Sequence, residues 1–249
     1  MILAHETVGA GLPVAFVHGF TQTRGSWAPL LAVPLSVEAT LIDAPGHGRS
    51  VDGARSLPQC GDDIAETMRT GVLVGYSMGA RMALHAALAH PAKVTGLVLI
   101  SGTAGIEDAG ERQSRRAADD ALADRIEEIG TDAFIDEWLA NPMFSGLSPA
   151  MAMRDERLRN SPRGLADSLR HAGTGTQEDL WPRLSGLSVP TLVITGAHDA
   201  KFTGIGERMH KAIAGSTHAQ VEGAGHTVHL EATAGTARIL LDWLLRRQR

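Results

Sequence analysis

A serine in a Gly-x-Ser-x-Gly pattern is the first sign of chemistry in the sequence. The pattern Gly75-Tyr76-Ser77-Met78-Gly79 lies between an expected strand, Val72–Val74, and an expected helix, Met78–Ala89. A strand–turn–helix setting presents the serine hydroxyl on a sharp turn, and the helix N-terminus offers N–H groups and a positive dipole to a developing anion. The pattern alone is weak, but this setting predicts that Ser77 is catalytic.

Two further residues could complete a catalytic triad with Ser77. Asp199 follows the expected strand Thr191–Ile194, and His226 follows the last strand candidate, His218–Val221. Catalytic groups of open α/β sheets gather at the carboxyl ends of the strands. A lone aspartate or histidine more often has a surface or capping role. The order serine, aspartate, histidine is that of the α/β-hydrolase fold, however, and it favours a triad.

Backbone N–H groups at two turns could bind an oxyanion. His18-Gly19-Phe20 directly follows the expected strand Val14–Val17. The N–H of Phe20 could therefore face the N–H of Met78 across the serine and form an oxyanion hole with two donors. His-Gly alone is an ordinary turn, so this prediction depends on its position.

No metal, nucleotide or other cofactor is expected. His198 and His229 lie near the candidate acid and base, but a metal site needs a third ligand, which is not evident. His5-Glu6 begins a zinc-protease pattern that Gly9 breaks. Neither a dinucleotide-binding loop nor a Walker A loop is present.

Short apolar runs that alternate with helical patterns indicate the fold that positions these residues. Expected helices are Met78–Ala89 and Ala232–Arg247. Continuous apolar strands are typical of a parallel sheet covered on both faces, so the fold class is α/β with a doubly wound sheet. The expected strands are Ile2–Thr7, Val14–Val17, Thr40–Ile42, Val72–Val74, Leu97–Ile100, Thr191–Ile194 and His218–Val221.

Residues 103–186 break this alternation. The segment has no convincing strand but contains three polar helical stretches, Glu111–Ala123, Thr131–Leu139 and Gly164–Ala172. We expect residues 103–186 to form a helical insertion between two parts of one core, residues 1–102 and 187–249.

Composition excludes several classes of protein. The chain has 249 residues, a net charge of -5 and one cysteine, Cys60. The acidic balance disfavours a nucleic-acid partner, and one cysteine forms no internal disulfide. No apolar run is long enough to span a bilayer, and the N-terminus lacks the features of a signal peptide. We expect a cytoplasmic enzyme without membrane insertion. Its oligomeric state and the role of Cys60 stay open.

The motifs together resemble the α/β-hydrolase superfamily over the whole chain. The resemblance implies a mostly parallel central sheet flanked by helices, with residues 103–186 as an inserted helical cap over the active site. The segments that carry it are His18-Gly19-Phe20, the run from Asp43 to Ser50, the serine pattern, Gly196-Ala197-His198-Asp199 and Gly225-His226.

Within the superfamily, the chain resembles the 2-succinyl-6-hydroxy-2,4-cyclohexadiene-1-carboxylate (SHCHC) synthases of menaquinone biosynthesis. The similar segments are Gly75 to Arg81, Trp138 to Phe144, Arg157 to Asn160, and Asp199 to Phe202. Ala80 and the segment Glu231-Ala232-Thr233 depart from the family pattern. The resemblance implies a lyase: Ser77, activated by His226 and oriented by Asp199, removes a ring proton, and pyruvate leaves without an acyl-enzyme.

The resemblance also implies a small-molecule substrate with three carboxylates. Because the protein is net negative, local cations must hold this substrate, and guanidinium groups pair with carboxylates in a two-pronged geometry. The candidates are Arg81, Arg115 and Arg159, with Tyr76 and Trp138 as further substrate-binding residues.

Two other functions stay open. A carboxylesterase or carbon–carbon bond hydrolase could use the same triad with Ser77 as a nucleophile, since a fold does not determine a function. A ligand receptor without catalysis is the second alternative, against which the intact set of Ser77, Asp199 and His226 argues.

Overall fold

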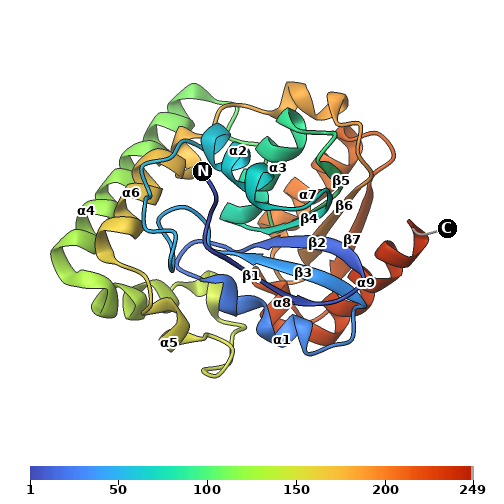
Figure 1. Cartoon of the computed structure of the whole chain (residues 1–249). Helices are drawn as coiled ribbons and strands as arrows, with labels where there is room; N and C mark the ends of the chain where they lie inside the picture. Colours follow the sequence, from blue (N-terminus) through green and yellow to red (C-terminus); the bar gives the residue numbers. More distant parts are fainter. Residues whose placement is uncertain (248–249) are drawn as a thin grey trace.

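Seven strands form one sheet in the computed structural model, which describes residues 1–247 (Figure 1). The strand order is β1-β3-β2-β4-β5-β6-β7, and only β1 runs antiparallel to its neighbour. The expected mostly parallel sheet is therefore confirmed. The strands are β1 His5–Gly9, β2 Leu12–Val17, β3 Val37–Ile42, β4 Gly71–Tyr76, β5 Val94–Ile100, β6 Thr191–Gly196 and β7 Thr217–Val221.

Helices cover both faces of the sheet, because successive side chains of each strand point to opposite faces. On β2, Ala15 and Val17 pack with α2, α3 and α7, whereas Val14 and Phe16 pack with α1, α8 and α9. No helix within residues 1–247 is long and apolar enough to cross a membrane. The bounds are α1 Ala28–Leu31, α2 Leu57–Thr67, α3 Met78–Ala89, α7 Ala200–Ala212, α8 Val228–Glu231 and α9 Thr233–Arg246.

The first strand lies later in the chain than the expected Ile2–Thr7. The backbone N–H of Leu3 donates to Thr67 Oγ1 at 2.9 Å, and that of Ala4 donates to Ser50 Oγ at 2.9 Å. These amides are bound to side chains rather than to a neighbouring strand. The ladder with β3 therefore begins at His5.

Helices α2 and α7 were not expected from the sequence. For α2, the reason is a glycine inside the helix. Gly61 interrupts the helical pattern of α2, and glycine disfavours a helix interior. In the structure, however, a Cβ at this position would lie 2.8 Å from the backbone nitrogen of Ala86 on α3. Gly61 thus allows α2 and α3 to pack closely.

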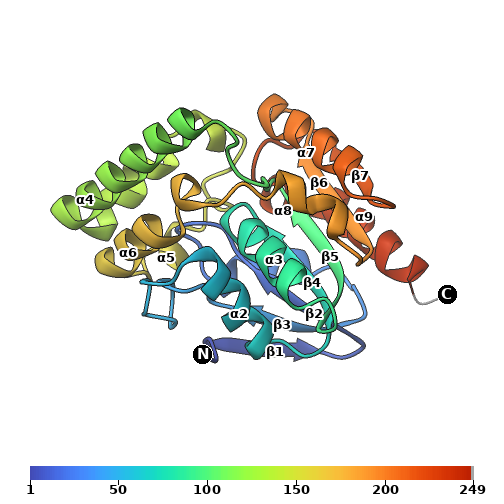
Figure 2. The same cartoon turned by 90° about the horizontal axis from the view of Figure 1, so that it is seen from above.

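Residues 103–186 contain helices and turns and no strand, and the helices α4 (Ala109–Leu139) and α6 (Pro162–Ala172) within them lie to one side of the sheet (Figure 2). Helix α4 is kinked at Gly130, whose φ of 79° separates the two expected helical stretches. Helices α4 and α6 share an apolar cluster that includes Ile126, Phe134 and Leu165. The segment also contains α5 Arg154–Arg157 and the 3-10 turns Pro142–Phe144, Thr174–Thr176 and Trp181–Gly186, whereas the 3-10 turn Arg24–Trp27 lies between β2 and α1.

Candidate active site

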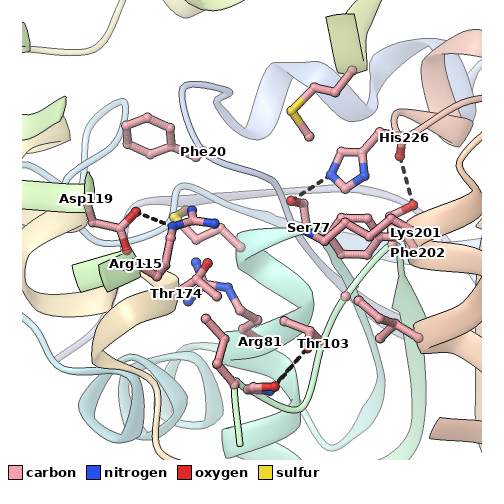
Figure 3. Close-up of a pocket in the computed structure, with 18 of the residues that line it drawn as sticks. Phe20, Ser77, Arg81, Thr103, Arg115, Asp119, Thr174, Lys201, Phe202 and His226 are labelled. Carbon is pink, nitrogen blue, oxygen red and sulfur yellow. Dashed lines mark hydrogen bonds and ion pairs between the residues drawn. The ribbon is translucent and has the colours of Figure 1, made fainter. Parts of the chain in front are cut away.

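Ser77, His226 and Asp199 meet at the carboxyl edge of the sheet, and Figure 3 shows Ser77 beside His226. The Ser77 Oγ lies 3.1 Å from His226 Nε2, and His226 Nδ1 lies 2.8 Å from Asp199 Oδ2. Burial acts to raise the pKa of Asp199, but the hydrogen bonds from His226 and from the Phe202 N–H outweigh burial, so the pKa lies below its usual value. An ionised Asp199 accepts the Nδ1–H of His226, which leaves Nε2 as the acceptor for the serine proton.

Ser77 lies in a strained turn that two glycines make possible. Its φ is 51° and its ψ is -108°, a conformation that residues other than glycine rarely adopt. A Cβ at Gly75 would lie 2.3 Å from the carbonyl oxygen of Gly79, and a Cβ at Gly79 would lie 2.2 Å from that of Val17. Gly75 therefore allows the turn to fold tightly onto the start of α3, and Gly79 allows it to pack against the end of β2.

The two candidate oxyanion donors, Met78 and Phe20, belong to the two segments that this contact brings together. Met78 is the first residue of α3, and Phe20 belongs to the turn that follows β2. Both residues line the same cavity as Ser77. The turn is closed by the Gln22 N–H, which donates to the Gly19 carbonyl at 3.1 Å, so its backbone direction is held.

Two buried histidines, His18 and His47, hold the turn that contains Phe20. His18 Nε2 accepts the Ala44 N–H at 3.0 Å, and His47 Nε2 accepts the Thr21 N–H at 3.3 Å. Burial lowers the pKa of His18, and burial is the main cause that lowers the pKa of His47 to about 3. Both rings are therefore neutral near pH 7, which lets Nε2 act as an acceptor.

A carboxylate that the sequence analysis had noted only as a departure from the family pattern holds the loop of His226. Glu231 Oε2 accepts the Gly225 N–H and Oε1 accepts the Thr227 N–H, each at 2.7 Å. The Ser101 hydroxyl also donates to the His226 carbonyl at 2.8 Å. Hydrogen bonds to the backbone before, at and after His226 therefore hold this loop in place.

The ring of Tyr76 lines the cavity, but its hydroxyl bonds to the protein. The Tyr76 hydroxyl lies 3.0 Å from Thr227 Oγ1, and burial raises its pKa. The structure therefore gives Tyr76 a second contact that the sequence did not indicate, a link from β4 to the residue after His226.

The cavity in front of Ser77 has a volume of about 800 Å³ and a partly aromatic wall. Trp138, which we expected near the substrate, lines it and packs edge-to-face on Phe20 with ring centroids 5.3 Å apart. Phe144 lies 5.6 Å from Trp138 between ring centroids. These rings come from both the insertion and the core.

Four arginines line this cavity, Arg81, Arg115, Arg157 and Arg208, and Arg208 pairs with Glu107. Arg81 is 7% exposed and donates to the Ala172 carbonyl at 2.8 Å. Arg157 is 2% exposed and donates to the Ala152 carbonyl at 2.8 Å and to the Thr21 hydroxyl. Neither makes an ion pair with any residue in 1–247, and burial is the main cause that lowers the pKa of each to about 10. Arg115 lines the cavity as well and pairs with Asp119.

The expectation for Arg159 is corrected by the structure. Its side chain is 65% exposed, pairs with Glu156 at 2.8 Å and does not line the cavity. Arg157, two residues earlier, lies there instead. Side chains two residues apart on a helical turn point about 200° apart, so only one of the two can face the substrate.

His229 and Cys60 lie outside the cavity. His229 is buried between Trp27 and Tyr76, with ring centroids 4.6 Å and 4.5 Å away. Cys60 is buried on α2, and burial raises the pKa of its thiol to about 12. In the part of the chain that the structure describes, no three His, Cys, Asp or Glu side chains gather in a way that could hold a metal ion.

Comparisons with known proteins agree with this fold. The model of the alpha/beta hydrolase family matches residues 14–239. A Bacillus subtilis (strain 168) protein assigned as an SHCHC synthase is 37% identical over 97% of this chain and 93% of its own. The SHCHC synthase of Serratia proteamaculans (strain 568) is 32% identical over 92% of both chains. The solved structure of MenH from S. aureus is 29% identical and has a TM-score of 0.90 over 100% of both chains.

The buried histidines predict that acid destabilises the protein. His47 has a pKa of about 3 in the folded state, whereas an unfolded histidine titrates near pH 6.5. Between these values the unfolded state binds more protons, so the free energy of unfolding falls as the pH is lowered from about 6.5. Denaturant titrations at a series of pH values would measure this slope.

The substitution His47→Gln should make this slope shallower. His171→Gln, at an exposed site, is the matched control and should leave the slope as it is. An unchanged slope in the His47 variant would contradict the assignment of a buried neutral ring.

The grip of Glu231 on the histidine loop predicts a loss of serine reactivity in Glu231→Gln. The variant keeps the size of the side chain but places an NH₂ group against one of two backbone N–H donors. The rate constant for labelling Ser77 with a fluorophosphonate should fall about 10- to 100-fold, because small misplacements of a catalytic group cost this much.

Glu222→Gln, at an exposed position just before the same loop, serves as the control and should label at the rate of the unchanged protein. Equal rates for both variants would show that Glu231 does not position His226.

Proposed function

The chain belongs to the alpha/beta hydrolase family and, within it, to the SHCHC synthases, and from this we propose that it is the lyase of that step in menaquinone biosynthesis. The proposed substrate is 2-succinyl-5-enolpyruvyl-6-hydroxy-3-cyclohexene-1-carboxylate. The reaction eliminates pyruvate and leaves SHCHC, a conjugated diene. A cytoplasmic location belongs to the same proposal.

The proposed reaction begins with transfer of a ring proton to the triad. Carbon 2 of the ring carries the succinyl ketone, so loss of its proton places negative charge on the ketone oxygen. Ser77 Oγ takes this proton while His226 takes the hydroxyl proton, and the N–H groups of Phe20 and Met78 bind the oxyanion. Ser77 acts as a base in this sequence and forms no covalent intermediate.

Collapse of this anion completes the elimination. A double bond forms between carbons 2 and 3, the bond between carbons 3 and 4 shifts to carbons 4 and 5, and the carbon–oxygen bond at carbon 5 breaks. The enolpyruvate leaves and becomes pyruvate by tautomerisation. The proton held on His226 returns to the departing group or to solvent, so no oxidant, reductant or cofactor is needed.

The observation that carries the proposal is a pair of buried guanidinium groups that face the cavity without an ion pair among residues 1–247. Arg81 and Arg157 remain charged near pH 7, because their lowered pKa of about 10 is still well above it. A buried cation without a partner is costly, and a bound carboxylate would offset that cost. With Arg115, three cations would meet the three carboxylates of the substrate.

We further propose that residues 103–186 form a cap domain and that residues 1–102 and 187–249 form the core. The insertion has its own apolar cluster, which supports this division. It also contributes Arg115, Trp138 and Arg157 to the wall of the cavity, whereas the triad lies on the core.

The test of this function is to add the protein to enzymatically generated precursor and to follow the absorbance of the diene and the release of pyruvate together. We expect both in equal amounts, and neither with Ser77→Ala. Turnover of a p-nitrophenyl ester at ordinary enzymatic rates, with none of the precursor, would instead favour an esterase.

The position of Arg157 predicts that Arg157→Ala damages turnover while Arg159→Ala does not. Removing one partner of a buried charged pair costs about 2–5 kcal/mol, which is roughly 30-fold to several thousand-fold in kcat/KM. The exposed Arg159 is the matched control two residues away, and its variant should stay within about twofold of the unchanged protein.

Steady-state kinetics on the precursor would measure both variants. Arg157→Lys should rescue activity only in part, since an ammonium group does not reproduce the geometry of the guanidinium. A larger loss for Arg159→Ala than for Arg157→Ala would restore the expectation drawn from the sequence.

A further inference from the structure

A turn at the end of α6, residues 172–175, contacts one cavity arginine, Arg81, and the carboxylate that binds a second, Arg115. The carbonyl of Ala172 accepts a hydrogen bond from Arg81 Nη1 at 2.8 Å. The N–H of Gly175 donates to Asp119 Oδ2 at 2.9 Å, and the other oxygen of Asp119 accepts from Arg115 Nε at 2.8 Å. Figure 3 shows Thr174 between Arg81 and Arg115, with Asp119 paired to Arg115.

Asp119 is buried and bonded to both Arg115 and the turn, so it can fix the orientation of the Arg115 side chain. Asp119 is 2% exposed, whereas the side chain of Arg115 is 43% exposed and lines the cavity. The bond to Asp119 uses Nε of Arg115, so it leaves the edge formed by the two terminal nitrogens for another partner. Two terminal nitrogens on one edge can pair with a carboxylate in a two-pronged geometry.

Two glycines let the turn approach α4 closely. A Cβ at Gly173 would lie 2.6 Å from Asp119 Oδ2, and a Cβ at Gly175 would lie 2.2 Å from the backbone nitrogen of Arg116. Because the turn contacts both the Asp119 carboxylate and the backbone of α4, it leaves little freedom for the relative position of Arg81 and Arg115.

The charges of these residues act on one another. Burial is the main cause that lowers the pKa of Arg81, the charge of Arg115 lowers it further, and the charge of Asp119 raises it. The two guanidinium groups are thus near enough to repel, and the carboxylate between α4 and the turn offsets part of that repulsion.

We propose that Asp119 is a positioning residue that, with the 172–175 turn, holds Arg81 and Arg115 at a fixed separation and so selects ligands with two carboxylates. This inference deepens the proposed function and rests on it for the identity of the substrate. The selection itself concerns the ligand class, a small dicarboxylate, and can be measured without turnover.

The experiment compares binding of succinate and butyrate by calorimetry, because these four-carbon acids differ in having two carboxylates or one. The unchanged protein should bind succinate at least about tenfold more tightly than butyrate, the size of one charge-assisted hydrogen bond. Asp119→Asn and Arg115→Ala should each lose this preference, and the double variant should lose no more than Arg115→Ala alone.

The matched control is Asp63→Asn, which removes another buried carboxylate that pairs with an arginine, Arg55, away from the cavity. This variant should lower Tm while keeping the preference for succinate. Independent, multiplicative losses in the double variant would assign Asp119 a general structural role and overturn the proposal, as would unchanged preference in Asp119→Asn.

Kinetics on the precursor add a second readout. Asp119→Asn should raise KM by about tenfold and change kcat little, since Asp119 acts on binding and not on the triad. A fall in kcat at constant KM would contradict the proposal. If the unchanged protein prefers succinate but does not turn over the precursor, the proposed function fails and the positioning role stands.

Discussion

The steric contact between the Ser77 turn and the end of β2 is the constraint on which the site depends. Only glycine at position 79 allows the turn to approach the carbonyl of Val17 so closely. The strained backbone of Ser77 costs on the order of 1–3 kcal/mol, and β4, buried along its length, holds it in place. Because Phe20 lies three residues after the end of β2, the same contact brings the serine and the candidate oxyanion donor Phe20 together, whatever the position of residues 103–186.

Burial has opposite consequences for histidines and arginines in this protein. It lowers the pKa of His47 to about 3, so the ring is neutral and serves as a hydrogen-bond acceptor for the backbone. It lowers the pKa of Arg157 only to about 10, so the guanidinium stays charged. A protein with a net charge of -5 can thereby keep positive charge in the buried wall of the cavity, since Arg81 and Arg157 stay charged when buried, whereas His18 and His47 are neutral near pH 7.

The sequence predicted what depends on local pattern and missed what depends on tertiary contact. The elements that carry Ser77, Asp199 and His226 are strand exits, which apolar runs and glycines reveal. The choice between Arg157 and Arg159 depends on the register of a four-residue helix that begins after Met153, whose φ is 50°. A helix of four residues is too short to show a hydrophobic periodicity that would tell which side chain faces the cavity. Glu231 and Asp119 act through backbone N–H groups of folded turns, which a side-chain pattern does not show.

Under the proposed function, the arrangement of the arginines explains how one triad is directed to elimination rather than to acyl transfer. A nucleophilic serine needs a carbonyl carbon at Oγ, whereas a basic serine needs a C–H bond there. Arg81 lies one helical turn after Ser77, and its backbone N–H donates to the Ser77 carbonyl at 3.2 Å. In the proposed reaction, one group that binds a carboxylate is therefore held at a fixed position relative to the base. Arg115 and Arg157 lie on the insertion. The atom that faces Ser77 is then set by how far these cations stand from Arg81, and a change in the insertion alone could change the reaction.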